Sequence, residues 1–322
     1  MSALVVALRR HTNPAILTAI GCIIALLIAG SFYSANFLSP DYLLQQLQVA
    51  SFLGVVATGA MIVILLGHID LSVPWVMTLG AMMSTAAAGW WGDLGTALAI
   101  PFGVAVGAVI GIFNGIGVAY LRVPSMIFTL GMNAVVQGLV VVHTGGFAPQ
   151  DHATETMHAL STGRALFGLP NALLLWAVLA AAMIFLLTRT TFGRKVYAIG
   201  NREKAAYLSG VDTRFVVLVC FIISGAMSAL AGVLLAGYAT KAYQAMGDPY
   251  LLPAIAAVVL GGTNILGGRG SYAGTIVGTI LITLLQSILS VMQMAEVGRQ
   301  IIYGAVIILM LLTYGRGAKT QA

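Results

Sequence analysis

The chain consists of long apolar runs separated by short polar connections. Because about 20 residues are needed to cross a bilayer as a helix, each long run predicts one membrane span. The apolar segments cover residues 15–33, 43–66, 72–91, 97–119, 124–143, 169–188, 215–238, 251–262, 272–292 and 299–314. The pattern predicts an all-α polytopic membrane protein with about ten transmembrane segments, since helices satisfy their own backbone inside lipid.

The segment 251–262 is shorter than the others. It cannot span as an ideal helix, so we predict a short or broken span that irregular backbone continues through the following TNILGGRG. A second glycine-rich interruption, GHIDLSVP at residues 67–74, lies in the first half of the chain. The two interruptions suggest a possible inverted repeat of about five spans per half, although their likeness is too weak to establish one.

Composition and charge agree with a membrane protein. Of the residues 60% are hydrophobic and 7% charged, and mean hydropathy is +1.00, whereas soluble domains carry about 25% charged residues. With the odd-numbered connections outside, all of the 15 Lys and Arg except Arg164, Lys241 and Arg299 fall on the cytoplasmic side. This positive-inside distribution predicts that both termini are cytoplasmic.

Two polar segments interrupt a chain that otherwise reads as a single transmembrane domain over residues 1–322. Residues 144–168 form a polar external loop, and residues 189–214 form a basic cytoplasmic loop. In the second loop Asn201 is a suitable N-cap, Glu203 suits the positive helix terminus and Gly210 suits the position after the C-cap. We therefore expect a short exposed helix over 202–209.

The apolar surface of this short helix suggests a docking knob for a soluble partner. It is expected to comprise Ala205, Ala206 and Leu208, amid basic residues. The alternative is a solvated loop that only satisfies the positive-inside tendency.

Small residues recur at four-residue steps in three predicted spans. Such spacing lets helix backbones approach closely, so we interpret these stripes as packing rather than chemistry. The stripes are Gly103, Gly107, Gly111 and Gly115; Ser224, Ser228, Gly232 and Ala236; and Gly270, Gly274 and Gly278.

Polar groups at membrane depth are the candidates for a translocation pathway. A stripe of Ser125, Thr129, Asn133 and Gln137 occupies one face of the fifth segment. Interhelical hydrogen bonding explains it, and so does a wet pathway for a neutral, hydroxyl-rich solute. The full set of pathway candidates is Asp70, Ser72, Asn114, Ser125, Thr129, Asn133, Gln137 and Asn264.

Asp70 interrupts the apolar run MIVILLGHIDLSVPWVMTLG. A carboxylate in hydrocarbon costs about 3 kcal/mol on insertion scales, so it needs a partner or water. Either Asp70 or Ser72 can cap the helix that follows, which predicts that Asp70 accepts backbone N–H groups there. Direct contact with a solute is the alternative, and a proton-coupled carrier would use the same carboxylate as its relay.

Several kinds of chemistry lack a motif in this chain. There is no GxxxxGK[ST] loop to hold a nucleotide. The spacing of His152, Glu155 and His158 differs from the zinc-protease pattern. We therefore expect no cofactor, no bound metal, no covalent catalysis and no nucleic-acid partner.

Four motifs occur here in the order and spacing of a known family. GHIDLSVPWVMTLGAMMS, GIFNGIGVAYLRVPSMIFTLGMN, TTFGRKVYAIGNREKAAYLSGV and AVVLGGTNILGGRGSYAGTIVG resemble the ribose-type permeases of carbohydrate ABC transporters, within the branched-chain amino acid/ribose permease superfamily. The chain departs from the family's glycine-rich GGIDLSVG at His68 and Pro74.

This resemblance implies a multi-pass permease of the bacterial inner membrane that imports a sugar or polyol and is not itself an enzyme. It implies a second permease copy (homodimer or heterodimer), cytoplasmic ATPase subunits, a periplasmic solute-binding protein and contact with membrane lipid. Residues 144–168 would be periplasmic, and the helix from Asn201 to Gly210 would couple to the ATPase. A permease for branched-chain amino acids or nucleosides, and an ion-coupled secondary carrier, remain as alternatives.

Overall fold

The fold is an all-helical bundle in a computed structural model that describes residues 14–147, 149, 151–295, 297–305 and 308. No β-strand occurs in these ranges, which confirms the predicted class. The helices are α2 (Pro14–Tyr33), η1 (Ala35–Leu38), α3 (Pro40–Leu65), α4 (Val73–Ala119), α5 (Ser125–Thr144), α6 (Glu155–Thr162), α7 (Asn171–Arg189), α8 (Thr191–Leu208), α9 (Thr213–Ala239), η2 (Asp248–Tyr250), α10 (Leu251–Leu260) and α11 (Tyr272–Val291). Residues 297–305 are also helical.

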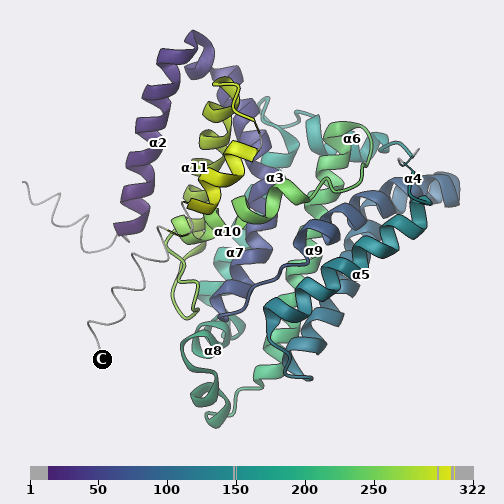
Figure 1. The fold of residues 1–322 in the computed structure, drawn as a ribbon, viewed down its shortest axis with the longest axis vertical. Coiled ribbons are helices and arrows are strands. Elements are labelled where there is room, and N and C mark those ends of the chain that lie inside the picture. The colour runs from purple at the N-terminus through teal and green to yellow at the C-terminus, as the bar shows by residue number, and fades with distance from the viewer. Residues whose placement is uncertain (1–13, 148, 150, 296, 306–307, 309–322) are drawn as a thin grey trace, which may run out of the picture.

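α9 is the central helix of the bundle. It packs against α4, α3, α6 and α8, while α2 and α11 stand on one side and α5 on the other (Figure 1). The two ends of the bundle differ: one carries α8, and the other carries α6. We refer to them as the α8 end and the α6 end.

α4 is a helical hairpin that contains two of the predicted spans, 72–91 and 97–119. Its backbone leaves helical geometry at Gly92, with φ 55° and ψ −128°. A Cβ on Gly103 would lie 2.7 Å from the carbonyl oxygen of Gly80, so the two limbs run side by side. With α4 divided, eight long apolar segments, the short α10 and the helical start at 297 follow the predicted order. Both chain termini, on which the predicted sidedness rests, and the end of the last segment lie outside the described residues.

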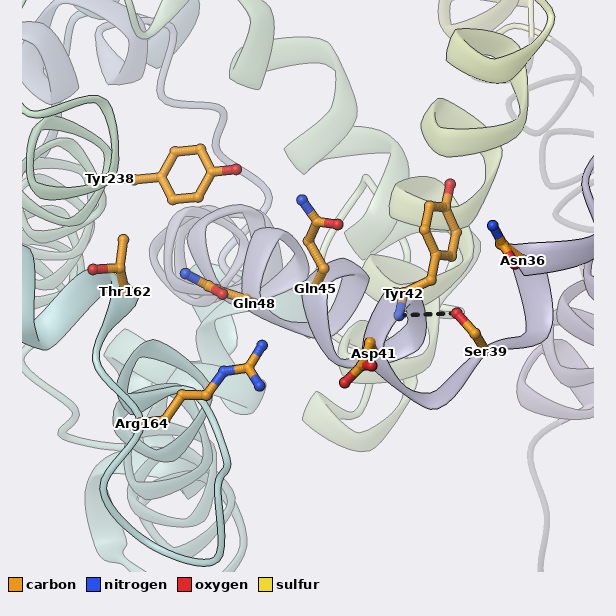
Figure 2. A pocket seen from close by; sticks show the side chains of 9 residues that line it. All are labelled: Asn36, Ser39, Asp41, Tyr42, Gln45, Gln48, Thr162, Arg164 and Tyr238. Atoms are coloured by element: carbon orange, nitrogen blue, oxygen red, sulfur yellow. Dashed lines mark hydrogen bonds between the residues drawn. The ribbon is translucent and has the colours of Figure 1, made fainter.

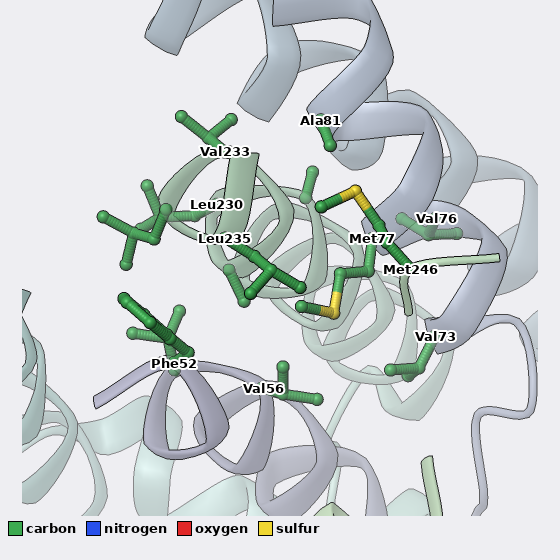
Figure 3. Close-up of a cluster of buried hydrophobic side chains, with 14 of the residues drawn as sticks. Phe52, Val56, Val73, Val76, Met77, Ala81, Leu230, Val233, Leu235 and Met246 are labelled. Atoms are coloured by element: carbon green, nitrogen blue, oxygen red, sulfur yellow. The ribbon is translucent and has the colours of Figure 1, made fainter. Parts of the chain in front are cut away.

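The main hydrophobic core lies where α3, α4 and α9 meet (Figure 3). Phe52 of α3, Met77 of α4 and Val233 of α9 are each at most 1% exposed. Met246, from the segment after α9, fills the same cluster. Burying side chains of this size stabilises the contact by about 1.5–3 kcal/mol each in aqueous transfer terms; inside lipid, close packing replaces that driving force.

Small residues form the helix contacts as the sequence predicts. A Cβ on Gly107 would lie 2.5 Å from the Gly225 carbonyl oxygen, and one on Gly232 would lie 1.9 Å from that of Met77. Likewise, a Cβ on Gly278 would meet the Ala257 carbonyl oxygen at 2.0 Å. These positions admit only hydrogen, so the backbones are in direct contact.

The broken span is built differently from the prediction. We expected irregular backbone after α10, whereas the irregular segment that enters the bundle comes before it. Thr240 pairs with Ala153 at the α6 end, but the Gly247 N–H already donates to the Thr78 hydroxyl at 3.2 Å inside α4. The segment TNILGGRG instead forms a loop at the α8 end, beside α8 (Figure 1).

The segment 144–168 is only partly a solvated loop. It contains α6, which packs on α9 and α7. Met157 is fully buried, the Ser161 hydroxyl donates to the Leu234 carbonyl, and Gln48 of α3 donates to the Ser161 carbonyl at 2.9 Å. The pattern of apolar runs did not predict this helix, because α6 is short, amphipathic and part of a polar segment.

Candidate functional site

Asp70 lies at the centre of a buried hydrogen-bond network. It is 6% exposed, and its Oδ1 accepts from the Ser72 N–H at 3.0 Å and the Ser72 hydroxyl at 2.6 Å. Its Oδ2 accepts from the Ser224 hydroxyl of α9 at 2.8 Å. Asn114, in the second limb of α4, donates to the Ser72 hydroxyl at 2.8 Å. The carboxylate therefore joins both limbs of α4 to α9 through donors that are all neutral.

Asp70 accepts a backbone N–H, as predicted, but of the two predicted cap candidates it is Ser72 that occupies the N-cap position. Ser72 is the N-cap of α4, and no side chain caps the first turn. Asp70 accepts the backbone N–H of Ser72 itself, one step before the helix, and two hydroxyls in addition. The sequence showed that the carboxylate needed donors, but it gave no sign that Ser224, 154 residues away, supplies one.

Little space exists beside Asp70. The adjacent cavity measures about 10 Å³ and is lined otherwise by apolar side chains of α3, α4 and α10. Such a volume holds at most one water molecule. Asn114 Oδ1, buried behind Ser72, has no hydrogen-bond partner. In this conformation neither residue contacts an open pathway.

The polar stripe on α5 has two halves with different surroundings. Thr129 Oγ1 accepts the Leu71 N–H at 2.9 Å, and Ser125 Oγ accepts the Ile69 N–H at 3.3 Å. These two residues secure the loop that carries Asp70. Further along α5, Asn133 Oδ1 is buried without a partner and Gln137 is exposed.

Asn133 and Gln137 line a groove of about 620 Å³ on the side of the bundle. Its other walls include Trp75 of α4, Asp248 of the broken span and Gln300. We call this cavity the α5 groove. Its volume falls within the range of small-molecule pockets, and amide and carboxylate groups among apolar walls are typical of sites for polar solutes. Asp248 and Gln300 were not among the predicted candidates, because Asp248 lies in a connection between predicted spans and Gln300 lies at the start of the last one, outside the polar stripe of the fifth segment.

A second cavity, of about 510 Å³, opens at the α8 end and brings loop and helix together. His68, Arg122, Glu203 and Arg214 line it, together with Ser125 of α5. The His68 ring packs near Phe221, with centroids 6.2 Å apart. His68, which departs from the family pattern, therefore lies in the loop that carries Asp70, near Phe221 of α9 and in the same cavity as Glu203 of α8.

A third cavity, of about 540 Å³, is lined by polar groups at the α6 end. Figure 2 shows Gln45 and Gln48 of α3, with Arg164 and Tyr238, around this space. No pattern of spacing brings these residues together, because they come from three separate parts of the chain.

The exposed helix of the basic loop differs from its prediction in two ways. Helical structure begins earlier than predicted, at Thr191. The helix is interrupted at Arg202, whose backbone is extended with φ −162° and ψ 96°. Asn201 precedes this interruption, so it is helical rather than an N-cap. Gly210 follows the helix with φ 81°, as predicted.

The apolar surface of this helix also has a different membership. Ala206 is 5% exposed and packs into the bundle, so it is not part of the surface. Leu208 is 85% exposed and Tyr207 66%, beside exposed Ala205. Glu203 accepts from the Thr213 hydroxyl at 3.3 Å, which holds the helix against the start of α9. The sequence pattern missed Tyr207.

Asn264 has a structural role in its loop. Its Oδ1 accepts the Leu266 N–H at 3.1 Å, and its carbonyl accepts from Gly267 at 2.9 Å. It does not line the α5 groove. The structure thus brings together Asp70, Ser72, Asn114, Ser125 and Thr129 in one contiguous set of contacts, places Asn133 and Gln137 in the groove, and separates Asn264 from both.

Comparison with known proteins gives consistent matches along this chain. The family model described as "Branched-chain amino acid transport system / permease component" matches residues 42–311. The ribose import permease protein RbsC of Escherichia coli (strain K12) is 32% identical over 310 residues, covering 94% of this chain and 96% of that protein. RbsC of Bacillus subtilis (strain 168) is 35% identical, covering 89% and 88%.

A relative named for a different solute matches with a similar identity. The autoinducer 2 import system permease protein LsrC of Yersinia pestis (strain Pestoides F) is 33% identical, covering 93% of this chain and 84% of that protein. No solved structure matches the chain. Because the family model and these relatives each cover most of its length, the chain belongs to the family of branched-chain amino acid transport system permease components, with ribose-type import permeases among its relatives.

Proposed function

We propose that the chain is the permease subunit of a binding-protein-dependent ABC importer that moves a sugar or polyol across the bacterial inner membrane. The observation that carries this proposal is the α5 groove, whose Asn133 and Gln137 offer neutral hydrogen-bonding groups to a solute. Two ribose import permeases among the relatives favour a hydroxyl-rich solute. The subunit performs no covalent chemistry.

A second permease copy would complete the pathway. The groove opens on the side of the bundle, where Gln137 is exposed next to large apolar side chains of α5 such as Leu130 and Leu139. Lipid cannot satisfy an amide in the hydrocarbon region. A homologous or identical subunit packed over α5 would cover the groove and supply its missing wall.

ATP hydrolysis would come from a separate subunit. The chain has no Walker A loop, and the exposed tip of α8, with Tyr207 and Leu208, offers the apolar knob for docking it. The α8 end would then be cytoplasmic, with both termini on that side, and the α6 end would face the periplasmic binding protein.

Two alternatives are less well supported. An ion-coupled carrier would need a titrating group with access to water, whereas Asp70 is held by three neutral donors beside a cavity of about 10 Å³. A branched-chain amino acid or nucleoside permease shares the family description, but among the described residues that line the groove Asp248 is the only charged one, so an amino acid's carboxylate has no cationic partner there.

The test is ATP-dependent uptake in proteoliposomes that contain this chain with its partner ATPase and binding protein. Radiolabelled ribose is the first probe, with leucine and adenosine as comparisons. We expect ribose or another polyol to enter only with ATP, and an uncoupler to have no effect. Uptake that requires a proton gradient, or that selects leucine, would contradict the proposal.

The docking role of α8 has its own test. Leu208→Glu should abolish copurification of the ATPase, since a carboxylate would enter an apolar contact. Leu166→Glu is the matched control, because Leu166 is an exposed leucine (54%) beyond α6 at the other end. Equal retention of the ATPase by both variants would remove α8 from the interface.

A further inference from the structure

Three chain segments meet at the α8 end in direct backbone contact. The Gly268 N–H, from the loop after α10, donates to the Leu65 carbonyl at the end of α3, at 2.9 Å. Gly200 of α8 lies over the same two groups. The Tyr197 hydroxyl of α8 donates to the Gly270 carbonyl at 2.9 Å, which makes a second connection between α8 and that loop. We call this set of contacts the glycine junction.

The glycine junction leaves no room for a side chain between its parts. A Cβ on Gly200 would lie 1.8 Å from the Leu65 carbonyl oxygen and 2.6 Å from the Gly268 nitrogen. Gly267 has φ 87°, and a Cβ there would lie 2.7 Å from the Gly67 nitrogen. Packed backbones at such distances move together, because neither has a side chain that can rearrange between them.

The glycine junction is also continuous with the loop that holds Asp70. Leu65 ends α3, and residues 66–72 lead directly from it to α4. Within that loop Leu71 bonds to Thr129 of α5, one helical turn from Asn133 in the groove. A displacement of α8 at Gly200 is thus applied to a loop that is attached to the groove's own helix.

We propose that Gly200 and Tyr197 are positioning residues that transmit ATP-driven movement of the exposed tip of α8 to the Asp70 loop and the α5 groove. This inference rests on the proposed function and assigns a route within it. Neither residue lines the α5 groove, and both precede the break of α8 at Arg202 that leads to the exposed tip. Their contribution is to make hydrolysis and solute movement occur together, rather than to hold the fold.

The experiment measures solute taken up per ATP hydrolysed in the reconstituted complex. Tyr197→Phe keeps the ring but removes the bond to Gly270, and we expect the ratio to fall about fivefold while ATPase association and hydrolysis persist. Gly200→Ala should lower the ratio at least as much. Tyr33→Phe is the matched control, because Tyr33 is an exposed tyrosine (61%) at the end of α2, outside α8 and the α5 groove, and it should leave the ratio unchanged.

The outcomes distinguish this inference from the proposed function. If the wild-type complex shows no ATP-dependent uptake, the proposed function fails and the transmission route fails with it. If wild-type uptake is normal and Tyr197→Phe keeps the full ratio, only the route is overturned. Should Gly200→Ala fail to assemble, Tyr197→Phe decides alone, since loss of one hydroxyl leaves the packing of the ring intact.

Discussion

Two helices carry small or polar residues at every fourth position, and their environments differ. On α9 the stripe of Ser224, Ser228, Gly232 and Ala236 is buried, and 67% of the most apolar stretch of that helix is buried as well. On α5, Ser125 and Thr129 bond to the loop that carries Asp70, whereas Asn133 and Gln137 line the groove. Only 22% of the most apolar stretch of α5 is buried. The spacing is the same in both helices.

What differs is whether the chain itself supplies the partner. The Ser224 hydroxyl bonds to Asp70, and the Ser228 hydroxyl bonds to the Ser224 carbonyl. Asn133 Oδ1 has no partner, although an unsatisfied buried acceptor costs about 1–3 kcal/mol. We infer that α9 belongs to the part of the protein that is complete as a single chain, and that the second half of α5 is completed by other molecules.

The largest expected difference in stability between α9 and α5 comes from replacing one glycine by alanine in each helix. Gly232→Ala on α9 should destabilise the protein by about 3 kcal/mol, because its Cβ would meet the Met77 carbonyl oxygen at 1.9 Å. Gly138→Ala on α5 meets nothing within 4 Å and should be neutral or stabilising by up to about 1 kcal/mol.

Thermal unfolding in detergent, followed by circular dichroism, measures this difference. Wild-type protein and an exposed control such as Leu166→Ala give the baseline. Equal destabilisation at Gly232 and Gly138 would mean that α5 is as tightly packed as α9, and the comparison of the two helices would fail.

Much of this fold follows from the sequence, since span length and small-residue spacing are local properties. The two limbs of α4, the packing stripes and Gly210 after α8 are placed as predicted. Local pattern could not reveal that Ala206 is buried and Tyr207 exposed, because the orientation of α8 depends on its contacts with the α3 and α9 ends. It also missed that the irregular half of the broken span precedes α10.

The candidate site was predictable in its residues but less so in its geometry. A carboxylate in an apolar run requires donors, and that requirement identified Asp70. The donors themselves come from α9 and from the second limb of α4, through contacts that join residues 154 and 42 positions apart. Only the fold determines such pairings, and for the same reason the sequence could not separate the two halves of the α5 stripe.

A second, smaller effect concerns the network that joins α4 to α9. Asp70→Ala removes the acceptor for two hydroxyls and one N–H. It also removes the cost of burying a carboxylate, so the free energy of unfolding should fall by a net amount of about 2 kcal/mol. In Asp70→Asn the Oδ1 still accepts from Ser72, and the new amide donates to the Ser224 oxygen. The loss should therefore stay below about 1 kcal/mol.

Unfolding in detergent and uptake with an uncoupler check this pair together. The network interpretation requires that the asparagine variant keeps most of its stability and its ATP-dependent uptake. If asparagine is as damaging as alanine, and uptake becomes sensitive to the uncoupler, the charge of Asp70 is in use and the carboxylate is more than a structural acceptor.

The smallest expected effect on stability comes from comparing substitutions in the two halves of α5, at Thr129 and Asn133, which lie one turn apart. Thr129→Val removes the hydroxyl that accepts the Leu71 N–H and should cost about 1–2 kcal/mol. Asn133→Leu removes an amide whose Oδ1 has no partner, so stability should change by less than about 0.5 kcal/mol while uptake falls strongly, since the groove loses a polar group. Asn133→Gln, which keeps the amide, is the control for uptake. Normal uptake by Asn133→Leu would remove the groove from the pathway, and a large loss of stability would show that α5 is completed within the chain after all.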